Sequence, residues 1–324
     1  MLVPILLFIA GLICLIKGGD WFVDGAVAVA RRFHVSEMLI GATVVSIGTT
    51  LPEVMVSTAS AVGGHGEIAY GNAIGSVICN AALIAAVSIA VRPGSVDRKT
   101  LRIPVAFFFA AAAAYAVFAY GTGFFPRIFG ILLLLVFAAY IAVNFFSMKK
   151  NPDNEEGESL PGEDHGETKL WKDILFLAIG AALIAVGARL LIDNGIIIAQ
   201  QLGVPESVIA LTFVALGTSL PELVTAITSL VKGHSDLSLG NIVGANVLNL
   251  VLVCGMSITL APFSLPESAV IQGRNASLVL ELPVMFLVML FLTVPALAKG
   301  KTYRIQGILM LVIYAAFCAV QFTL

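Results

Sequence analysis

The stretch GTTLPE at residues 48–53 returns as GTSLPE at residues 217–222. Each copy lies in an apolar run long enough to cross a lipid bilayer, and each places a glutamate, Glu53 or Glu222, within that run. A carboxylate at membrane depth is costly, so it is by default a candidate functional residue. An apolar segment interrupted by Gly and Pro at matching places in two halves of a chain predicts the binding site of a transporter.

The two prolines are expected to break their helices beside these glutamates. Pro52 has no N–H, and its ring clashes with the carbonyl of Gly48, one turn earlier; Pro221 has the same relation to Gly217. Each motif then offers a freed carbonyl, a carboxylate and neighbouring hydroxyls, which belong to Thr49, Thr50, Thr218 and Ser219. An all-oxygen ligand set favours Na⁺ or Ca²⁺ over a soft metal.

Composition indicates a membrane protein. The chain has 324 residues, of which 59% are hydrophobic and 12% charged, whereas soluble domains average about 25% charged residues. It has no basic patch with interleaved aromatic residues, which argues against nucleic-acid binding. It also has no nucleophile–base pair or zinc-binding spacing, which argues against an intramembrane enzyme. We therefore predict an all-α polytopic protein embedded in the lipid bilayer.

Hydropathy predicts ten transmembrane helices in two groups of five. Taking about 20 residues per span, we place them at 2–26, 38–62, 70–90, 101–120, 126–146, 171–199, 206–231, 238–260, 277–297 and 303–322. An acidic stretch rich in Gly and Pro separates the groups and is predicted to be a solvated linker. This gives a first unit at 1–148, a linker at 149–170 and a second unit at 171–324.

The two groups are internal repeats. Residues 41–80 align with 210–249 without a gap at a constant offset of 169, and 15 of the 40 positions are identical. Because each group has an odd number of spans, the second must insert in the opposite orientation. Inverted repeats place a transport site near the bilayer midplane.

The next span of each repeat adds polar residues at helical spacing. One face of span three carries Asn72, Ser76 and Asn80, and the same face of span eight carries Asn241, Ala245 and Asn249. Helix–helix hydrogen bonding is the alternative role for these asparagines. Spans two, three, seven and eight contain no basic residue that could pair with Glu53 or Glu222, so we favour ligands. Gly240 and Gly244 are expected to let span eight approach span seven, its neighbour in sequence.

Lys and Arg residues predict the orientation. With the N-terminus on side A, fourteen of them fall on side B and two on side A. Side B receives Arg31, Arg32, Arg92, Arg98, Lys99, Arg102, Lys149, Lys150, Lys169, Lys172, Lys232, Lys299, Lys301 and Arg304; side A receives Arg127 and Arg274. By the positive-inside rule side B is cytoplasmic, so the linker is cytoplasmic and both termini face outward.

The doubled G-T-[TS]-L-P-E, each followed by G-N-x-[IV]-G-[SA], resembles the repeats of prokaryotic sodium/calcium exchangers in the cation/Ca²⁺ exchanger superfamily. The resemblance implies antiport of Ca²⁺ against Na⁺ by alternating access in a prokaryotic plasma (inner) membrane, with no cofactor besides the transported ions. It also implies that spans one and six slide across the remaining helices. The ligands it implies are Thr49, Thr50, Glu53, Ser76 and Asn80, then Thr218, Ser219, Glu222, Ala245 and Asn249, with the carbonyls of Ser46 and Ala215.

The sequence departs from that family pattern at two positions of the second repeat. Members commonly carry a third acid where Asn249 stands and a serine where Ala245 stands. The two remaining glutamates supply two negative charges, which one Ca²⁺, two Na⁺ or two H⁺ would neutralise. We therefore expect exchange without net charge movement. A Ca²⁺/H⁺ antiporter is the main alternative, and a cation channel is a remote one.

Overall fold

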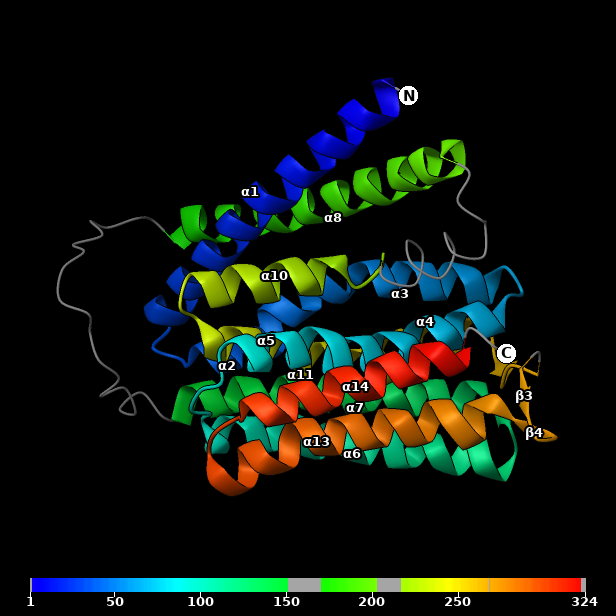
Figure 1. The fold of residues 1–324 in the computed structure, drawn as a ribbon. Helices are drawn as coiled ribbons and strands as arrows, with labels where there is room; N and C mark the ends of the chain where they lie inside the picture. The colour runs from blue at the N-terminus through cyan, green and yellow to red at the C-terminus, as the bar shows by residue number, and fades with distance from the viewer. Residues whose placement is uncertain (1, 151–169, 203–216, 268, 322–324) are drawn as a thin grey trace.

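The computed structural model describes residues 2–150, 170–202, 217–267 and 269–321, and these are mostly helical (Figure 1). In these ranges, nine helical segments are long and apolar enough to cross a membrane. They are Leu2–Arg32, Glu37–Val62, Gly66–Val91, Arg98–Gly121, Arg127–Phe146, Leu170–Ile198, Ser235–Leu260, Ser277–Lys299 and Arg304–Gln321. Each overlaps one predicted span. The predicted span 206–231 is represented by Leu220–Val231, because its first part lies outside the described residues. The prediction of a polytopic helical membrane protein is confirmed.

Six of the helices are single segments. They are α1 (Leu2–Arg32), α6 (Arg98–Gly121), α7 (Arg127–Lys150), α8 (Leu170–Gln201), α10 (Leu220–Val231) and α14 (Arg304–Gln321). Helix α1 continues beyond the predicted end at residue 26, and its last turn carries Arg31 and Arg32. Long basic side chains can extend from a buried helix end towards the polar interface, so the helix need not stop where the apolar run does.

In the described residues, four spans contain a wider π-helical turn, which the sequence did not predict. Span two joins α2 (Glu37–Ile40), η1 (Gly41–Val45) and α3 (Ser46–Val62). Span three joins α4 (Gly66–Cys79), η2 (Asn80–Ala85) and α5 (Ala86–Val91), and span eight joins α11 (Ser235–Leu248), η4 (Asn249–Val253) and α12 (Cys254–Leu260). Span nine joins η5 (Ser277–Glu281) and α13 (Leu282–Lys299). Such turns are rare and often occur at functional sites.

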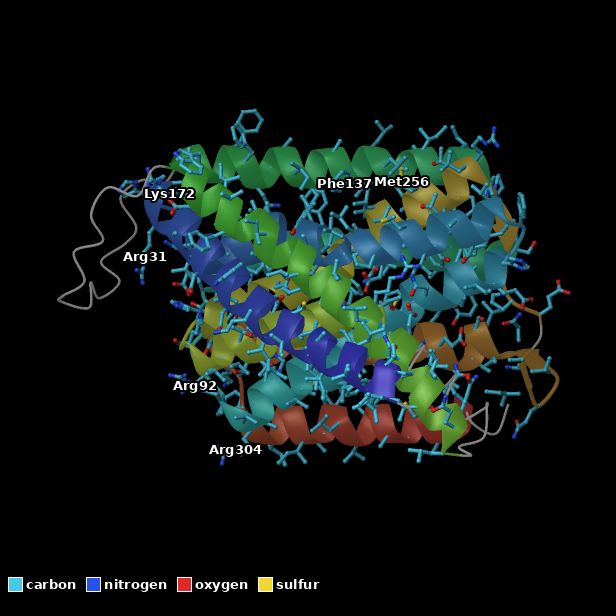
Figure 2. The ribbon with its side chains drawn as sticks, turned by 90° about the horizontal axis from the view of Figure 1, so that it is seen from above. Arg31, Arg92, Phe137, Lys172, Met256 and Arg304 are labelled. Carbon is cyan, nitrogen blue, oxygen red and sulfur yellow. The ribbon has the colours of Figure 1, made fainter. Side chains whose placement is uncertain are left out.

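The course of the chain agrees with an inverted repeat. Helix α1 begins and α14 ends at one end of the bundle, whereas α7 ends and α8 begins at the other (Figure 1). Helices α3 and α10, which carry the two motifs, run in opposite directions (Figure 1). Arg31, Arg92, Lys172 and Arg304 lie together at the second end, which we call the basic end (Figure 2).

Short strands close the connections between helices. Strand β1 (Phe124–Phe125), between α6 and α7, pairs antiparallel with β2 (Phe263–Ser264), which follows α12. This pair links the two repeats at the end opposite the basic end (Figure 1). Strands β3 (Val270–Ile271) and β4 (Arg274–Asn275) form a small antiparallel hairpin before span nine.

Helices α1 and α8 form a close antiparallel pair across one face of the bundle (Figure 1). Gly11, Gly18 and Gly25 recur every seven residues on α1 and meet the backbone of α8. A Cβ at Gly11 would lie 2.9 Å from the Gly187 carbonyl oxygen, and one at Gly180 would meet the Phe22 backbone nitrogen. Small residues allow such close approach in membranes, where dispersion contacts and not hydrophobic burial hold helices together.

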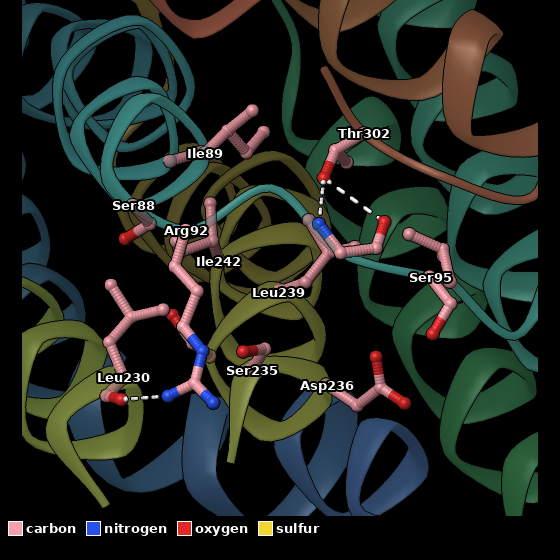
Figure 3. Close-up of a pocket in the computed structure, with 14 residues that line it drawn as sticks. Ser88, Ile89, Arg92, Ser95, Leu230, Ser235, Asp236, Leu239, Ile242 and Thr302 are labelled. Atoms are coloured by element: carbon pink, nitrogen blue, oxygen red, sulfur yellow. Dashed lines mark hydrogen bonds between the residues drawn. The ribbon is translucent and has the colours of Figure 1, made fainter. Parts of the chain in front are cut away.

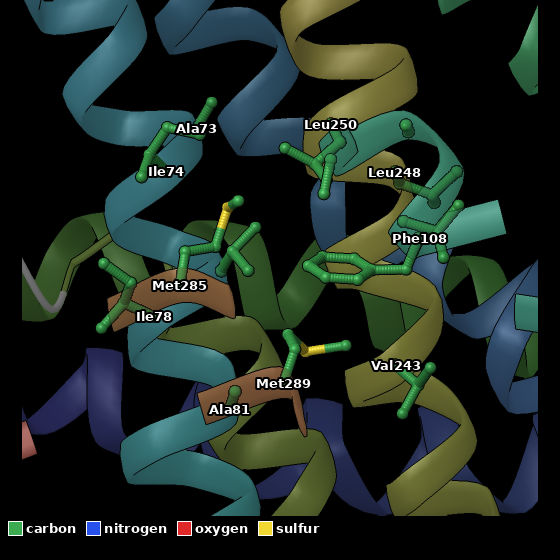
Figure 4. Packing of buried hydrophobic residues seen from close by; sticks show 14 of the residues in the cluster. Ala73, Ile74, Ile78, Ala81, Phe108, Val243, Leu248, Leu250, Met285 and Met289 are labelled. Carbon is green, nitrogen blue, oxygen red and sulfur yellow. The ribbon is translucent and has the colours of Figure 1, made fainter. Parts of the chain in front are cut away.

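The hydrophobic core lies around spans three and eight. Phe108 of α6 and Met285 and Met289 of α13 project between these two spans, near Ile78 and Val243 (Figure 4). All five side chains are almost fully buried. Methionine side chains adapt to irregular gaps, which suits this position between helices that cross at different angles.

The predicted role of the second-repeat glycines needs correction. A Cβ at Gly240 would meet the Met38 carbonyl oxygen, and one at Gly244 would lie 2.6 Å from Ala42. These glycines therefore let span eight approach span two of the other repeat, and not the described part of span seven. The pseudo-symmetric arrangement brings helices from opposite repeats together, which proximity in sequence does not reveal.

Candidate functional site

Both motif glutamates are completely buried. Glu53 lies in α3 and Glu222 in the first turn of α10, each with 0% exposure. Helices α3 and α10, which carry the two carboxylates, contact each other. No hydrogen-bond donor or ion-pair partner from the described residues reaches any of their four oxygens. These carboxylates therefore lack the internal compensation that buried charges normally have.

The prolines beside these glutamates act differently in the two repeats. Helix α3 continues from Ser46 to Val62 with Pro52 inside it, so the prediction that Pro52 breaks its helix is wrong. Neighbouring helices can support a membrane helix that lacks one backbone hydrogen bond. Helix α10 instead begins after Ser219, and Pro221 occupies its first turn, where the missing N–H costs no helical hydrogen bond.

The two predicted asparagines, Asn80 and Asn249, are also buried without hydrogen-bond partners among the described residues. Asn80 and Asn249 both have 0% exposure, and neither the amide oxygen nor the amide nitrogen of either has a hydrogen-bond partner in the described chain. Each is the first residue of a π-helical turn, η2 or η4. Segment η2 packs against α10, and η4 packs against α3. Each asparagine segment therefore contacts the glutamate helix of the other repeat.

Hydroxyl groups join the repeats near the glutamates. The Thr49 hydroxyl donates to the Asn241 side-chain oxygen at 3.2 Å, and the Ser219 hydroxyl lies 3.5 Å from that of Ser76. The Thr50 hydroxyl is buried without a partner among the described residues. These contacts join span two to span eight and span three to span seven.

The remaining predicted positions are less directly placed. The Ser46 carbonyl accepts a weak hydrogen bond from the Thr49 hydroxyl at 3.4 Å. Thr218 is half-buried in the turn that precedes α10. Ala245 is fully buried but offers no polar side-chain atom. Ala215 lies outside the described residues.

Three further asparagines lie near this cluster: Asn72 and Asn241, on the predicted polar faces of spans three and eight, and Asn246, which was not predicted. Asn241 accepts the Thr49 hydrogen bond, and Asn72 donates to the Glu53 carbonyl oxygen at 3.3 Å and to the Ser57 hydroxyl at 2.8 Å. The Asn246 amide lies 3.2 Å from the Met289 sulfur. Asn246 aligns with Val77 in the other repeat, so a search for matched residues passes over it. Its place in an otherwise apolar span is the signal that identifies it.

Helices α1 and α8 cover the cluster on one side. A very small cavity lies between Phe22 of α1, Ile184 of α8 and the two motif prolines, Pro52 and Pro221. The Phe22 ring is 3.3 Å from the place of a Cβ at Gly48. The first motif is therefore in direct contact with helix α1, which covers it.

A separate cavity of about 30 Å³ lies at the basic end (Figure 3). Arg92 closes one side by donating to the Leu230 carbonyl oxygen at 3.1 Å, and Thr302 accepts from the Gly94 N–H at 3.0 Å. Asp236 is the acidic residue that lines this cavity, and neither Glu53 nor Glu222 lines it. This cavity is therefore distinct from the glutamate cluster.

Comparison with known proteins identifies the family. The sequence pattern described as "Sodium/calcium exchanger protein" matches residues 3–146 and 172–323. The chain belongs to the sodium/calcium exchanger protein family. The resemblance inferred from the two motifs is confirmed.

Relatives in this family match along nearly their whole length. The Methanosarcina acetivorans sodium/calcium exchanger MaX1 is 30% identical, covering 99% of both chains. The Escherichia coli inner membrane protein YrbG is 33% identical, covering 95% of this chain and 94% of YrbG. A solved structure of the sodium-calcium exchanger NCX_Mj superposes with a TM-score of 0.80 at 30% identity, covering 99% of both chains.

Proposed function

We propose that this protein exchanges Na⁺ for Ca²⁺ across a prokaryotic inner membrane, and that Glu53 and Glu222 bind the ions. Membership of the sodium/calcium exchanger family supports the transported ions. The observation that carries the site is the set of buried, unpartnered oxygens on Glu53, Glu222, Asn80 and Asn249. Unpartnered buried polar groups are rare in folded proteins, and a bound cation would coordinate oxygens from all four side chains at once.

The chemistry of the cluster suits these ions. Carboxylate, amide and hydroxyl oxygens are the ligands that Ca²⁺ prefers. We assign Thr49, Thr50, Thr218, Ser219 and Ser76 as further ligands, with the carbonyls of Ser46 and Ala215. The paired glutamates supply two negative charges, equal and opposite to the charge of one Ca²⁺ or two Na⁺.

We propose that the bound ions reach the two membrane surfaces by alternating access. The ligands come from spans two, three, seven and eight, while α1 and α8 cover them from one side. The antiparallel courses of α3 and α10 support two similar paths leading from a midplane site to opposite surfaces (Figure 1). Movement of the α1–α8 pair over the motif helices would expose the ions to one surface at a time.

We also propose the orientation and the division of the chain. The units are 1–148 and 171–324, joined by the cytoplasmic linker 149–170. The grouping of Arg31, Arg92, Lys172 and Arg304 at one end supports a cytoplasmic basic end and outward-facing termini (Figure 2).

Ca²⁺ uptake into vesicles loaded with Na⁺ or with K⁺, at equal pH inside and outside, tests this function. We expect uptake from Na⁺-loaded vesicles only, with loss of at least about tenfold in Glu53→Gln and in Glu222→Gln, because each removes a charged ligand from a dry site. Glu67→Gln is the matched control, since Glu67 is an exposed glutamate in the first turn of α4. Equal losses in all three variants would contradict the site assignment.

Ca²⁺/H⁺ antiport is the second candidate. The observation that favours it is that two carboxylates, without a third, line the cluster in the described chain, and two protons would neutralise them. Uptake that ignores Na⁺ but follows an imposed pH gradient would establish this alternative.

A further inference from the structure

A large groove at the basic end lies apart from the glutamate cluster. Its volume is about 930 Å³, and it opens beside the last turns of α1 and the first turns of α8. His34, from the connection between spans one and two, and His234, from the turn before α11, also line it. The groove therefore joins the α1–α8 pair to the rest of the bundle.

The walls of the groove are apolar where they face the bilayer. Trp21 of α1 and Phe176 of α8 line it, are 37% and 47% exposed, and pack edge to face with ring centroids 5.9 Å apart. Aromatic side chains of this kind concentrate where a membrane protein meets the lipid headgroups. Since α1 and α8 span the membrane, the medium beside these rings is lipid.

The polar end of the groove holds an arginine, Arg31, that has no ion-pair partner among the described residues. Two acids line the groove, but Asp173 pairs with Arg32 at 3.2 Å, and Asp24 shares Lys232 with Asp20, at 2.7 Å and 3.5 Å. Arg31 is exposed and forms no ion pair with any residue that the structure describes. Arg31 and Lys172 both lie at this end of the bundle (Figure 2).

We propose that this groove binds an anionic phospholipid of the adjacent leaflet, with its phosphate on Arg31 and an acyl chain along Trp21 and Phe176. The arginine fork matches phosphate geometry and can donate two hydrogen bonds to it. Basic pockets between membrane helices recognise anionic headgroups in this way. A free phosphate ion would satisfy Arg31 but would leave the aromatic wall without a partner, which favours the lipid.

The chain offers a direct probe, because it has two tryptophans, Trp21 and Trp171. In a Trp171→Phe background, Trp21 fluorescence reports contact with lipids that carry bromine on their acyl chains. The full chain is reconstituted in phosphatidylcholine vesicles containing increasing fractions of brominated phosphatidylglycerol. We expect quenching at lower fractions of brominated phosphatidylglycerol than of brominated phosphatidylcholine.

Variants assign the effect to the groove. Arg31→Gln should require about fivefold more phosphatidylglycerol for half-quenching, whereas Arg31→Lys, which keeps the charge but loses the fork, should require an intermediate amount. Arg102→Gln is the matched control, since Arg102 is exposed in the first turns of α6 at the same end. Equal quenching by both lipids, or equal shifts in Arg31→Gln and Arg102→Gln, would overturn the proposal. Reversal of quenching by millimolar inorganic phosphate would also overturn it, in favour of a free-anion site.

Discussion

At the residue scale, Thr49 holds two repeats together as well as lining the candidate site. Its hydroxyl donates to the side-chain oxygen of Asn241, and the amide nitrogen of Asn241 has no partner in the described chain. We expect Thr49→Val to lower the free energy of unfolding by about 1–3 kcal/mol, because it leaves a buried amide oxygen unpaired. Thermal unfolding of the purified protein measures this. Thr49→Ser keeps the hydroxyl and should lose much less; equal losses would show that methyl packing, and not the hydrogen bond, matters.

Asn249 decides the charge of the proposed site. With Glu53 and Glu222 as its acids, one Ca²⁺ or two Na⁺ balance it, so the parent should move no net charge during exchange. Asn249→Asp adds a third negative charge and should create a place for a third Na⁺. The cycle would then carry one net charge, which is worth about 2.3 kcal/mol per 100 mV.

Current recordings on reconstituted membranes test this prediction. We expect no transport current from the parent and a current from Asn249→Asp on addition of Ca²⁺. Glu222→Gln serves as the control that binds ions poorly. A clear Na⁺-dependent transport current from the parent protein would refute electroneutral exchange.

At the element scale, the contact between spans two and eight depends on glycine. Gly240 packs on the Met38 carbonyl, so a side chain there meets backbone and not a flexible side chain. We expect Gly240→Ala to destabilise the protein by about 1–3 kcal/mol, because one of the two helices must move. Gly121→Ala is the matched control, since open space surrounds that position among the described residues. Thermal unfolding compares the two, and similar losses would argue against close packing at Gly240.

The π-helical turns explain how one carbonyl near the site is satisfied. Segment η1 widens the helix at Ala42, and the buried Tyr140 hydroxyl of α7 donates to the Ala42 carbonyl oxygen at 2.6 Å. Tyr140 in turn packs edge to face against Phe107 of α6, with ring centroids 5.3 Å apart. Helices α6 and α7 thus support span two at the place where its regular hydrogen bonding is interrupted.

At the scale of the whole molecule, the orientation of the two repeats can be measured directly. Glu67 and Asp236 occupy equivalent positions of the two repeats at the alignment offset of 169. In an inverted repeat they must face opposite sides of the membrane. We expect a membrane-impermeant maleimide, added outside intact cells, to label Glu67→Cys but not Asp236→Cys.

The labelling needs a background in which the four native cysteines are replaced by alanine. Permeabilising the membrane should make Asp236→Cys reactive, which shows that its earlier silence came from sidedness and not from burial. Lys301→Cys, in the exposed connection between α13 and α14, should behave like Asp236→Cys. Labelling of Glu67→Cys and Asp236→Cys from the same side would exclude the inverted arrangement.

The sequence by itself determined the class, the spans and the polar residues of the candidate site. Membrane spans are predictable because lipid imposes a length and an apolar composition on each helix. Glu53, Glu222, Asn80 and Asn249 stood out because polar groups are expensive in such runs, and all four are buried without side-chain hydrogen-bond partners among the described residues. The repeat was visible because matched polar and glycine residues are rarely shared by chance between apolar helices.

Only the tertiary structure decided which helices meet. Gly240 and Gly244 pack on span two, and Thr49 bonds to Asn241, because the pseudo-symmetric fold places elements of opposite repeats side by side. The predicted helix break at Pro52 was wrong, because α3 continues through this proline. Surrounding helices stabilise α3 there, although local propensity disfavours a helix. The hydrophobic period and the composition of a segment predict a single helix. Contacts between helices depend on the packing of the whole bundle, and this packing brings the residues of the candidate site together.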